Sequence, residues 1–87
     1  MNDILSLLGK KGAAEVLLLL LGEKKNYTTI ADESTVSSRT LSRRLKELEE
    51  SGLVSREILQ DRRVRYSLTE KGATATELVK KLLDFER

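Results

Sequence analysis

Residues 37–52 read SSRTLSRRLKELEESG. At 100° per residue, the three leucines of this segment fall within about 60° of one another and form one apolar stripe. They are Leu41, Leu45 and Leu48. Ser37 is a typical N-cap residue, and Gly52 is a typical residue just after a helix. The segment therefore predicts an amphipathic helix from residue 38 to about residue 50.

The face opposite these leucines is basic near the start of the helix. Residues 39–46 contain four bases and no acid, and the acids follow in residues 47–50. The helix dipole favours the reverse order. A recognition helix in the major groove of DNA explains the order, because its N-terminal residues meet base edges and phosphates. We expect DNA contacts on this helix from Ser37, Ser38, Arg39, Thr40, Ser42, Arg43 and Lys46.

An alternative interpretation is a solvated helix that carries ordinary surface charges. Ion pairs spaced by four residues, Arg43–Glu47 and Lys46–Glu50, would then occupy the basic side chains. Such pairs would compete with DNA for the same bases.

After Gly52 the apolar period changes from 3.6 to 2, which is typical of strands. Two strands, about 53–59 and 63–68, are joined by a charged tip and predict a hairpin, or wing. Its arginines would lie on the phosphate backbone or enter the minor groove of DNA. These are Arg62, Arg63 and Arg65. The alternative role of a charged tip is to keep the hairpin from pairing with other chains.

The rest of the chain predicts further helices and a single domain over 1–87. The helices are one over 2–9 capped by Asn2 or Asp3, an apolar one from 13 to about 24, a short one that begins at Thr28 or Thr29 with Asp32 and Glu33 near its start, and a last one after Thr69. In this arrangement 28–50 is a helix-turn-helix, 53–68 is the wing, and 2–24 and 70–87 supply core and dimerisation helices. The fold class is mainly α with a small β-hairpin.

Composition narrows the chemistry further. The 87 residues include 16 Lys and Arg, 14 Asp and Glu, and no Cys, His, Pro or Trp. Disulfides, thiolate or imidazole metal sites and histidine-dependent triads are therefore excluded. We expect no enzyme activity, no catalytic residues, no cofactor and no metal.

The net charge of +2 hides an uneven distribution of bases. Seven of the eight arginines lie within 39–65, and most lysines lie outside that window. Because arginine suits bidentate phosphate and base contacts, this separation indicates a surface that faces nucleic acid. Chance and ordinary surface ion pairs are the alternative. Four lysines are candidates for additional phosphate contacts: Lys10, Lys11, Lys24 and Lys25.

The two ends of the chain carry more apolar surface than a small monomer needs. Apolar residues of the last helix span roughly 160° of the helical wheel, whereas about 100° covers a core. The surplus predicts a homodimer, and its expected interface is Ile4, Leu5, Leu8, Leu78, Val79, Leu82, Leu83 and Phe85. Alternatively, the N-terminal helix packs on the C-terminal helix within a monomer.

Two blocks of sequence resemble a known family. Residues 40–56, TLSRRLKELEESGLVSR, are similar to the recognition helix and first wing strand of winged helix-turn-helix transcription regulators, and 66–72, YSLTEKG, to their second wing strand and next helix. The resemblance covers 28–72 and is strongest to HxlR-like proteins. It implies a prokaryotic or archaeal-virus DNA-binding regulator that is usually a homodimer on a pseudo-palindromic operator. The Gly-Lys of residues 9–10 lacks the tryptophan that follows it in that family, and cysteine-based or metal sensing is not implied.

Together these patterns predict a sequence-specific regulator of transcription that binds double-stranded DNA and represses by occupying a promoter. A winged-helix module that binds other proteins is the alternative. The longest apolar run, 16–21, is too short for a membrane span, and Asp3 does not suit a signal peptide. We therefore expect a cytoplasmic protein associated with the nucleoid.

Overall fold

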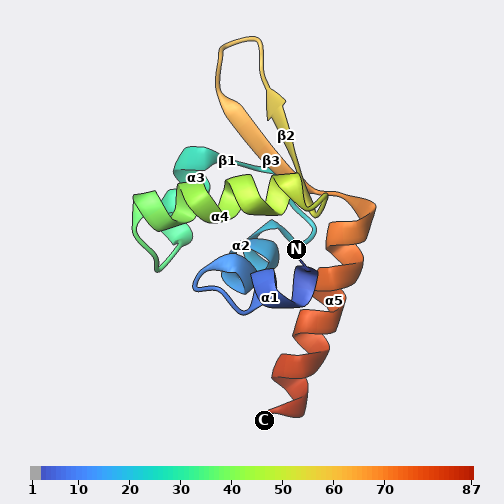
Figure 1. Cartoon of the computed structure of the whole chain (residues 1–87). Helices are drawn as coiled ribbons and strands as arrows, with labels where there is room; N and C mark the ends of the chain where they lie inside the picture. Colours follow the sequence, from blue (N-terminus) through green and yellow to red (C-terminus); the bar gives the residue numbers. More distant parts are fainter. Residues whose placement is uncertain (1–2) are drawn as a thin grey trace.

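A computed structural model describes residues 3–87 of the chain. The elements in this range are α1 (Ile4–Leu8), α2 (Ala13–Leu20), β1 (Lys25–Asn26), α3 (Tyr27–Glu33), α4 (Ser38–Glu50), β2 (Val54–Ile58), β3 (Val64–Leu68) and α5 (Glu70–Phe85). The hairpin of β2 and β3 rises above α4, and α5 continues past the body of the molecule to the C-terminus (Figure 1). Within 3–87, no helix is both long and apolar enough to cross a membrane.

Helix α4 is the predicted amphipathic helix, and its bounds are confirmed. The Oγ of Ser37 accepts a hydrogen bond from the backbone N–H of Thr40 at 3.2 Å, which caps the helix. Gly52 follows the helix with a φ of 81°, a conformation that strains other residues. The leucine stripe is fully buried: Leu41, Leu45 and Leu48. This burial turns the opposite face of α4 to solvent.

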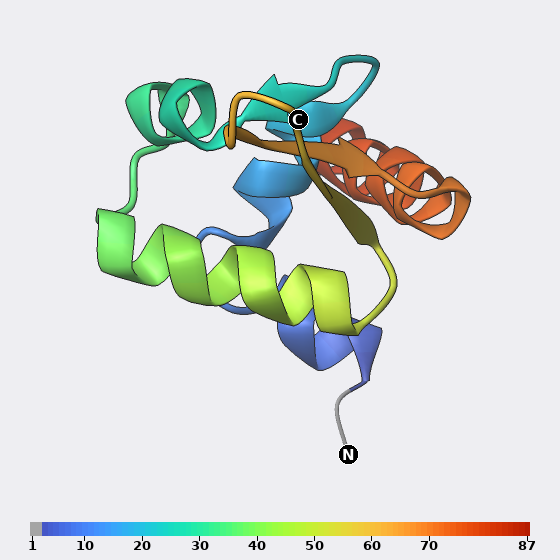
Figure 2. The ribbon, with the colours of Figure 1, turned by 90° about the horizontal axis from the view of Figure 1, so that it is seen from above.

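Helix α2 forms the centre of the core. Figure 2 shows it between α4 on one side and the sheet on the other. Val16, Leu17 and Leu20 are completely enclosed. The prediction that this helix extends to about residue 24 is wrong, because it ends at Leu20. Gly22, with a φ of 77°, turns the chain away toward β1.

Helix α3 begins earlier than predicted. Its N-cap is Asn26, whose Oδ1 accepts a hydrogen bond from the backbone N–H of Thr29 at 2.8 Å. Thr28 and Thr29, the predicted caps, therefore lie inside the helix, and the acids Asp32 and Glu33 lie in its last turn. The earlier start follows from the capping strength of asparagine, which exceeds that of threonine.

The cap of α1 is Asp3, whose Oδ1 accepts a hydrogen bond from the backbone N–H of Ser6 at 2.6 Å. Asn2, the other predicted cap, lies outside the described residues. Thr69 caps α5 as predicted.

The sheet contains a strand that the sequence patterns did not predict. Its order is β1-β3-β2, and both pairs are antiparallel. Strand β1 has two residues, too few for any alternation to be visible. The predicted hairpin of β2 and β3 is confirmed, and its tip turns at Arg62, which has a φ of 70°.

The start of α5 is held against the end of α4. The hydroxyl of Thr69 accepts a hydrogen bond from the N–H of Gly72 at 2.9 Å and donates one to the carbonyl of Gly52 at 2.6 Å. Gly72 makes this approach possible, because a Cβ there would lie 1.8 Å from the carbonyl oxygen of Leu53. The close packing of Gly72 on Leu53 holds the segment between the end of α4 and the start of β2 in place.

Glu15 on α2 holds the turn between α3 and α4. Its carboxylate accepts hydrogen bonds from the Oγ of Ser34 at 2.8 Å, the backbone N–H of Thr35 at 3.0 Å and the Oγ1 of Thr35 at 2.7 Å. The backbone hydrogen bond of Thr35 is the main cause that lowers the pKa of Glu15, and the two hydroxyls add to it. The ionised carboxylate thus anchors the N-terminal end of α4.

Substitution of Gly72 by alanine is expected to destabilise the fold. The new methyl group would overlap the backbone of Leu53, which must shift, so the free energy of unfolding should fall by about 3 kcal/mol or more. Gly9→Ala is the matched control, since the nearest atom to its Cβ is 3.5 Å away, and it should change stability by less than about 0.5 kcal/mol. Urea unfolding followed by circular dichroism measures both. Equal losses would contradict the proposed packing.

The Glu15 anchor should also be visible in the pH dependence of stability. A lowered folded-state pKa means that the contribution is complete above the ordinary value of 4.5 and is lost as the pH falls through the folded pKa. The difference in unfolding free energy between the native protein and Glu15→Gln should stay constant from about pH 7 to pH 5 and shrink below about pH 4.5. A difference that does not change with pH would contradict the role of the ionised carboxylate.

Candidate nucleic-acid interface

The solvent face of α4 carries most of the predicted DNA contacts. Arg39, Ser42, Arg43 and Lys46 are exposed, and Thr40 is half-buried on the same helix. Among residues 3–87, no carboxylate pairs with Arg39, Arg43 or Lys46. These cations are therefore free to meet an anionic partner.

The ion pairs of the alternative interpretation, Arg43–Glu47 and Lys46–Glu50, are absent from residues 3–87. Glu47 instead binds Lys10 at 2.8 Å and Arg44 at 2.9 Å, on the flank of α4 that faces α1. The hydrogen bond from Lys10 is the main cause that lowers the pKa of Glu47, and the one from Arg44 adds to it. Glu47 is thus held by Lys10 and Arg44, whereas Glu50, which lies on the same face as Arg39, Arg43 and Lys46, is exposed and has no ion pair within residues 3–87.

Arg44 braces α4 instead of facing solvent. Its Nε donates to the backbone carbonyl of Lys11 at 2.8 Å, and its guanidinium also holds Glu47. The helix is thereby tied to the loop between α1 and α2. Arg44 differs in this way from Arg43, its neighbour in the sequence.

Tyr27 is a residue of this interface that the sequence patterns missed. Its hydroxyl lies 3.0 Å from the Oγ of Ser42 and donates to the carbonyl of Ser38 at 3.3 Å. Ser38 and Ser42 are both predicted DNA contacts. The tyrosine links α3 to the first turns of α4 and orients Ser42. The one sequence signal that could have found it is the scarcity of aromatic residues, two Tyr and one Phe.

Ser37 acts first as a capping residue. Besides the backbone N–H of Thr40, its hydroxyl meets the Oγ1 of Thr40 at 3.2 Å. Both side chains lie at the N-terminal end of α4, beside the free arginines. They can reach a phosphate once the cap hydrogen bonds are satisfied.

The predicted wing arginines differ in their surroundings. Arg65 binds Glu57 across the hairpin at 2.7 Å, and Arg63 binds Asp61 at 2.7 Å. Arg62 is exposed at the tip, with no ion pair in the described range 3–87. The wing therefore has less free positive charge than its sequence suggests.

These pairs also lower the pKa values of the wing acids. The side-chain hydrogen bonds of Arg65 are the main cause for Glu57, and the backbone N–H of Arg63 is the main cause for Asp61. Both acids are ionised near neutral pH and hold the arginines in place.

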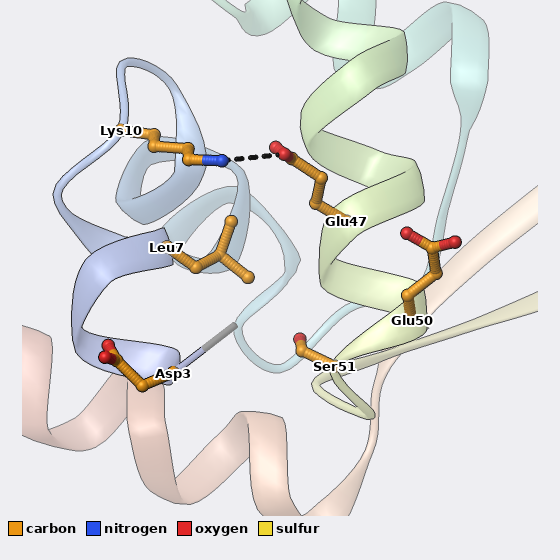
Figure 3. A pocket seen from close by; sticks show the side chains of 6 residues that line it. All are labelled: Asp3, Leu7, Lys10, Glu47, Glu50 and Ser51. Atoms are coloured by element: carbon orange, nitrogen blue, oxygen red, sulfur yellow. Dashed lines mark hydrogen bonds and ion pairs between the residues drawn. The ribbon is translucent and has the colours of Figure 1, made fainter. Parts of the chain in front are cut away.

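A hollow of about 110 Å³ lies between α1 and the C-terminal half of α4 (Figure 3). Its polar lining has three carboxylates against one ammonium, and that ammonium, Lys10, is bound to Glu47. The lining residues are Asp3, Leu7, Lys10, Glu47, Glu50 and Ser51. Such a hollow repels phosphate. Over residues 3–87, no group of three or more acidic, His or Cys side chains is placed to hold a metal ion.

The lysines predicted as additional phosphate contacts are not equivalent. Lys10 binds Glu47, and Lys25 binds Glu33 at 2.5 Å. Lys11 and Lys24 are exposed and have no ion pair within 3–87. Lys24 lies beside the wing, where it shares a shallow depression with Arg63 and Arg65.

The apolar residues predicted for a dimer separate into two groups. Leu78 is 57% exposed, Leu82 63% and Phe85 78%, and Leu5 and Leu83 are exposed as well. Ile4 and Leu8 are half-buried. Val79 is 7% exposed and packs within the chain itself, so the prediction that it lies in a dimer interface is wrong.

The whole arrangement has counterparts among known proteins. The sequence profile of the family described as HxlR-like helix-turn-helix matches residues 7–87. An uncharacterised HTH-type transcriptional regulator of Methanocaldococcus jannaschii is 33% identical over 97% of this chain and 79% of its own length. The HTH-type transcriptional regulator YodB of Bacillus subtilis is 37% identical over 83% of this chain and 67% of its own length.

Solved structures agree with this result. A possible HxlR family transcription factor from Thermoplasma volcanium has a TM-score of 0.84 and 36% identity, over 97% of this chain and 78% of its own. The reduced form of YodB has a TM-score of 0.83 and 29% identity, over 98% and 91%. Both the sequence match and the fold, with a winged helix-turn-helix and a basic solvent face on α4, therefore lead to one conclusion. The chain belongs to the HxlR-like helix-turn-helix family of transcriptional regulators.

Proposed function

We propose that this chain binds double-stranded DNA sequence-specifically, with α4 in the major groove. One observation carries the proposal: the solvent face of α4 presents three bases without carboxylate partners in residues 3–87, while Glu47 is held by Lys10 and Arg44. Those bases are Arg39, Arg43 and Lys46. Unpaired arginines on an exposed helix face are suited to guanine edges and phosphates.

The residues of the interface have different proposed roles. Arg39 and Arg43 read guanine O6 and N7, and Lys46 neutralises a phosphate. Ser37, Ser38, Thr40 and Ser42 make the shorter contacts to phosphates or bases. The wing lies on the backbone or in the minor groove and carries Arg62, Arg63 and Arg65.

We further propose that the protein acts as a homodimer and a repressor. The exposed apolar side of α5, together with Leu5, forms the interface between two copies, because such a surface is costly in water. Two recognition helices would then enter successive major grooves about 34 Å apart. A dimer of this kind, bound over a promoter in the cytoplasm at the nucleoid, excludes the transcription machinery.

A winged-helix module that binds other proteins is the alternative. An apolar or acidic exposed face on α4 would favour it, and the basic face argues against it. Loss of DNA binding with retention of a protein partner in a variant of this face would separate the two functions.

The double variant Arg39→Ala/Arg43→Ala should lose about 100-fold or more in affinity for a DNA site selected by the native protein. The log of the binding constant should fall linearly with the log of the salt concentration, by about 0.9 per phosphate neutralised, and the slope should be shallower in the variant. Fluorescence anisotropy titrations measure both quantities.

The matched control is Lys80→Ala/Lys81→Ala, which removes the same charge from α5. Its affinity should stay within about twofold of the native value. A salt response close to zero for the native protein, or equal losses in both double variants, would refute the proposed use of α4.

The double variant Leu78→Ser/Leu82→Ser should dissociate the dimer without unfolding the protomer, because both side chains are more than half exposed. Sedimentation should give a mass of twice 9.8 kDa for the native protein and 9.8 kDa for the variant. Ile58→Ser is the control, since Ile58 is equally exposed but lies on the wing. A native protein that sediments as a monomer would refute the dimer.

A further inference from the structure

The two strands of the wing present two chemically different faces. Residues directly opposite one another in an antiparallel pair share a face, and successive residues alternate. The register places Arg56 opposite Tyr66 and Ile58 opposite Val64 on one face. On the other face Glu57 lies opposite Arg65. We call the first the inner face and the second the outer face.

The inner face continues from the hydrophobic core. Val54, at the base of β2, and Tyr66, opposite Arg56, are buried in the same cluster as the leucines of α4. Helix α4 packs on β2, so the inner face is the one turned toward α4. Farther up the hairpin, which rises beyond α4 (Figure 1), this row emerges into solvent as Arg56 and Ile58.

The two faces also differ in the charge that they carry. Arg56 is exposed and has no carboxylate partner among residues 3–87. On the outer face Glu57 neutralises Arg65 at 2.7 Å. At the tip Asp61 does the same for Arg63. The net positive charge of the wing therefore lies on the inner face and at Arg62.

We infer that the wing contacts DNA through its inner face, with Arg56 on a phosphate or in the minor groove and Ile58 against the deoxyribose edge. This inference rests on the proposed DNA binding by α4 and names which wing residues join it. A free guanidinium suits the negative potential of the minor groove, and apolar side chains next to it pack against sugars and base steps.

The exposure of Ile58 supports this role. Its side chain is 63% exposed although it stands beside a cation on a strand that reaches past the core. The cross-strand pair with Val64 stabilises the hairpin and accounts for part of its apolar character. That pair does not account for a neighbouring arginine with no acid on the same face. A duplex lying across both α4 and the inner face would cover the two side chains together.

The test compares variants of the two faces on the DNA site selected by the native protein. Arg56→Ala should weaken binding about 10-fold and reduce the salt slope by about 1, a larger loss than that of Arg65→Ala on the outer face, whose charge Glu57 already neutralises. The matched control is Lys80→Ala on α5, which should stay within about twofold of the native affinity. Arg56→Gln, which keeps the length of the side chain, should behave like Arg56→Ala. Ile58→Thr keeps a β-branched residue in the strand and should weaken binding about threefold with an unchanged salt slope, because no charge is lost.

Thermal unfolding of each variant confirms that the wing is folded. An Arg65→Ala loss equal to or larger than that of Arg56→Ala would overturn the inference and assign the contact to the outer face. Unchanged affinity in both Arg56 variants, with binding still abolished by Arg39→Ala/Arg43→Ala, would overturn the inference and leave the proposed function intact. Absence of any DNA binding by the native protein would overturn both. A monomeric Ile58→Thr protein would overturn the assignment of Ile58 to DNA and place it between two copies of the chain.

Discussion

The burial of three leucines on one side of α4 is the constraint on which the rest of the structure depends. Leu41, Leu45 and Leu48 fix the rotation of the helix about its own axis, because each would expose apolar surface if the helix turned. Once the rotation is fixed, Arg39, Arg43 and Lys46 on the opposite face can only face solvent. The same packing sets the start of β2 and therefore the direction of the wing.

Ion pairing then decides which bases remain available. The chain has nearly as many acids as bases, 14 against 16. The location of free positive charge therefore depends on which base each acid pairs with, and not on the net charge. Glu47 selects Lys10 and Arg44 on one flank of α4. Glu57 and Asp61 neutralise two arginines of the wing. Among the arginines of residues 39–65, those left without an ion pair are Arg39 and Arg43 on α4, Arg56 on the inner face of the wing, and Arg62 at its tip.

Much of this could be predicted from local patterns. The leucine spacing and Gly52 predicted α4 and its end, and the change of period predicted the hairpin. The two-residue strand β1 could not be predicted, because its pairing depends on where β3 lies. The pairing of Glu47 with Lys10 could not be predicted either, since the two residues are distant in sequence. Arg65 was predicted as a DNA contact and Arg56 was not, because the ion pair between Arg65 and Glu57 joins two strands and cannot be read from the sequence.

Arg62 at the tip of the wing has a φ of 70°, in a region that glycine or asparagine occupies at lower cost. Glycine or asparagine at this position, neither of which carries a charge, would therefore stabilise the hairpin by about 1 kcal/mol. With arginine in that place, the turn carries conformational strain, and a cation lies exposed at the tip of the wing. The tip of the wing therefore carries a positive charge at a position where an uncharged residue would make the turn more stable.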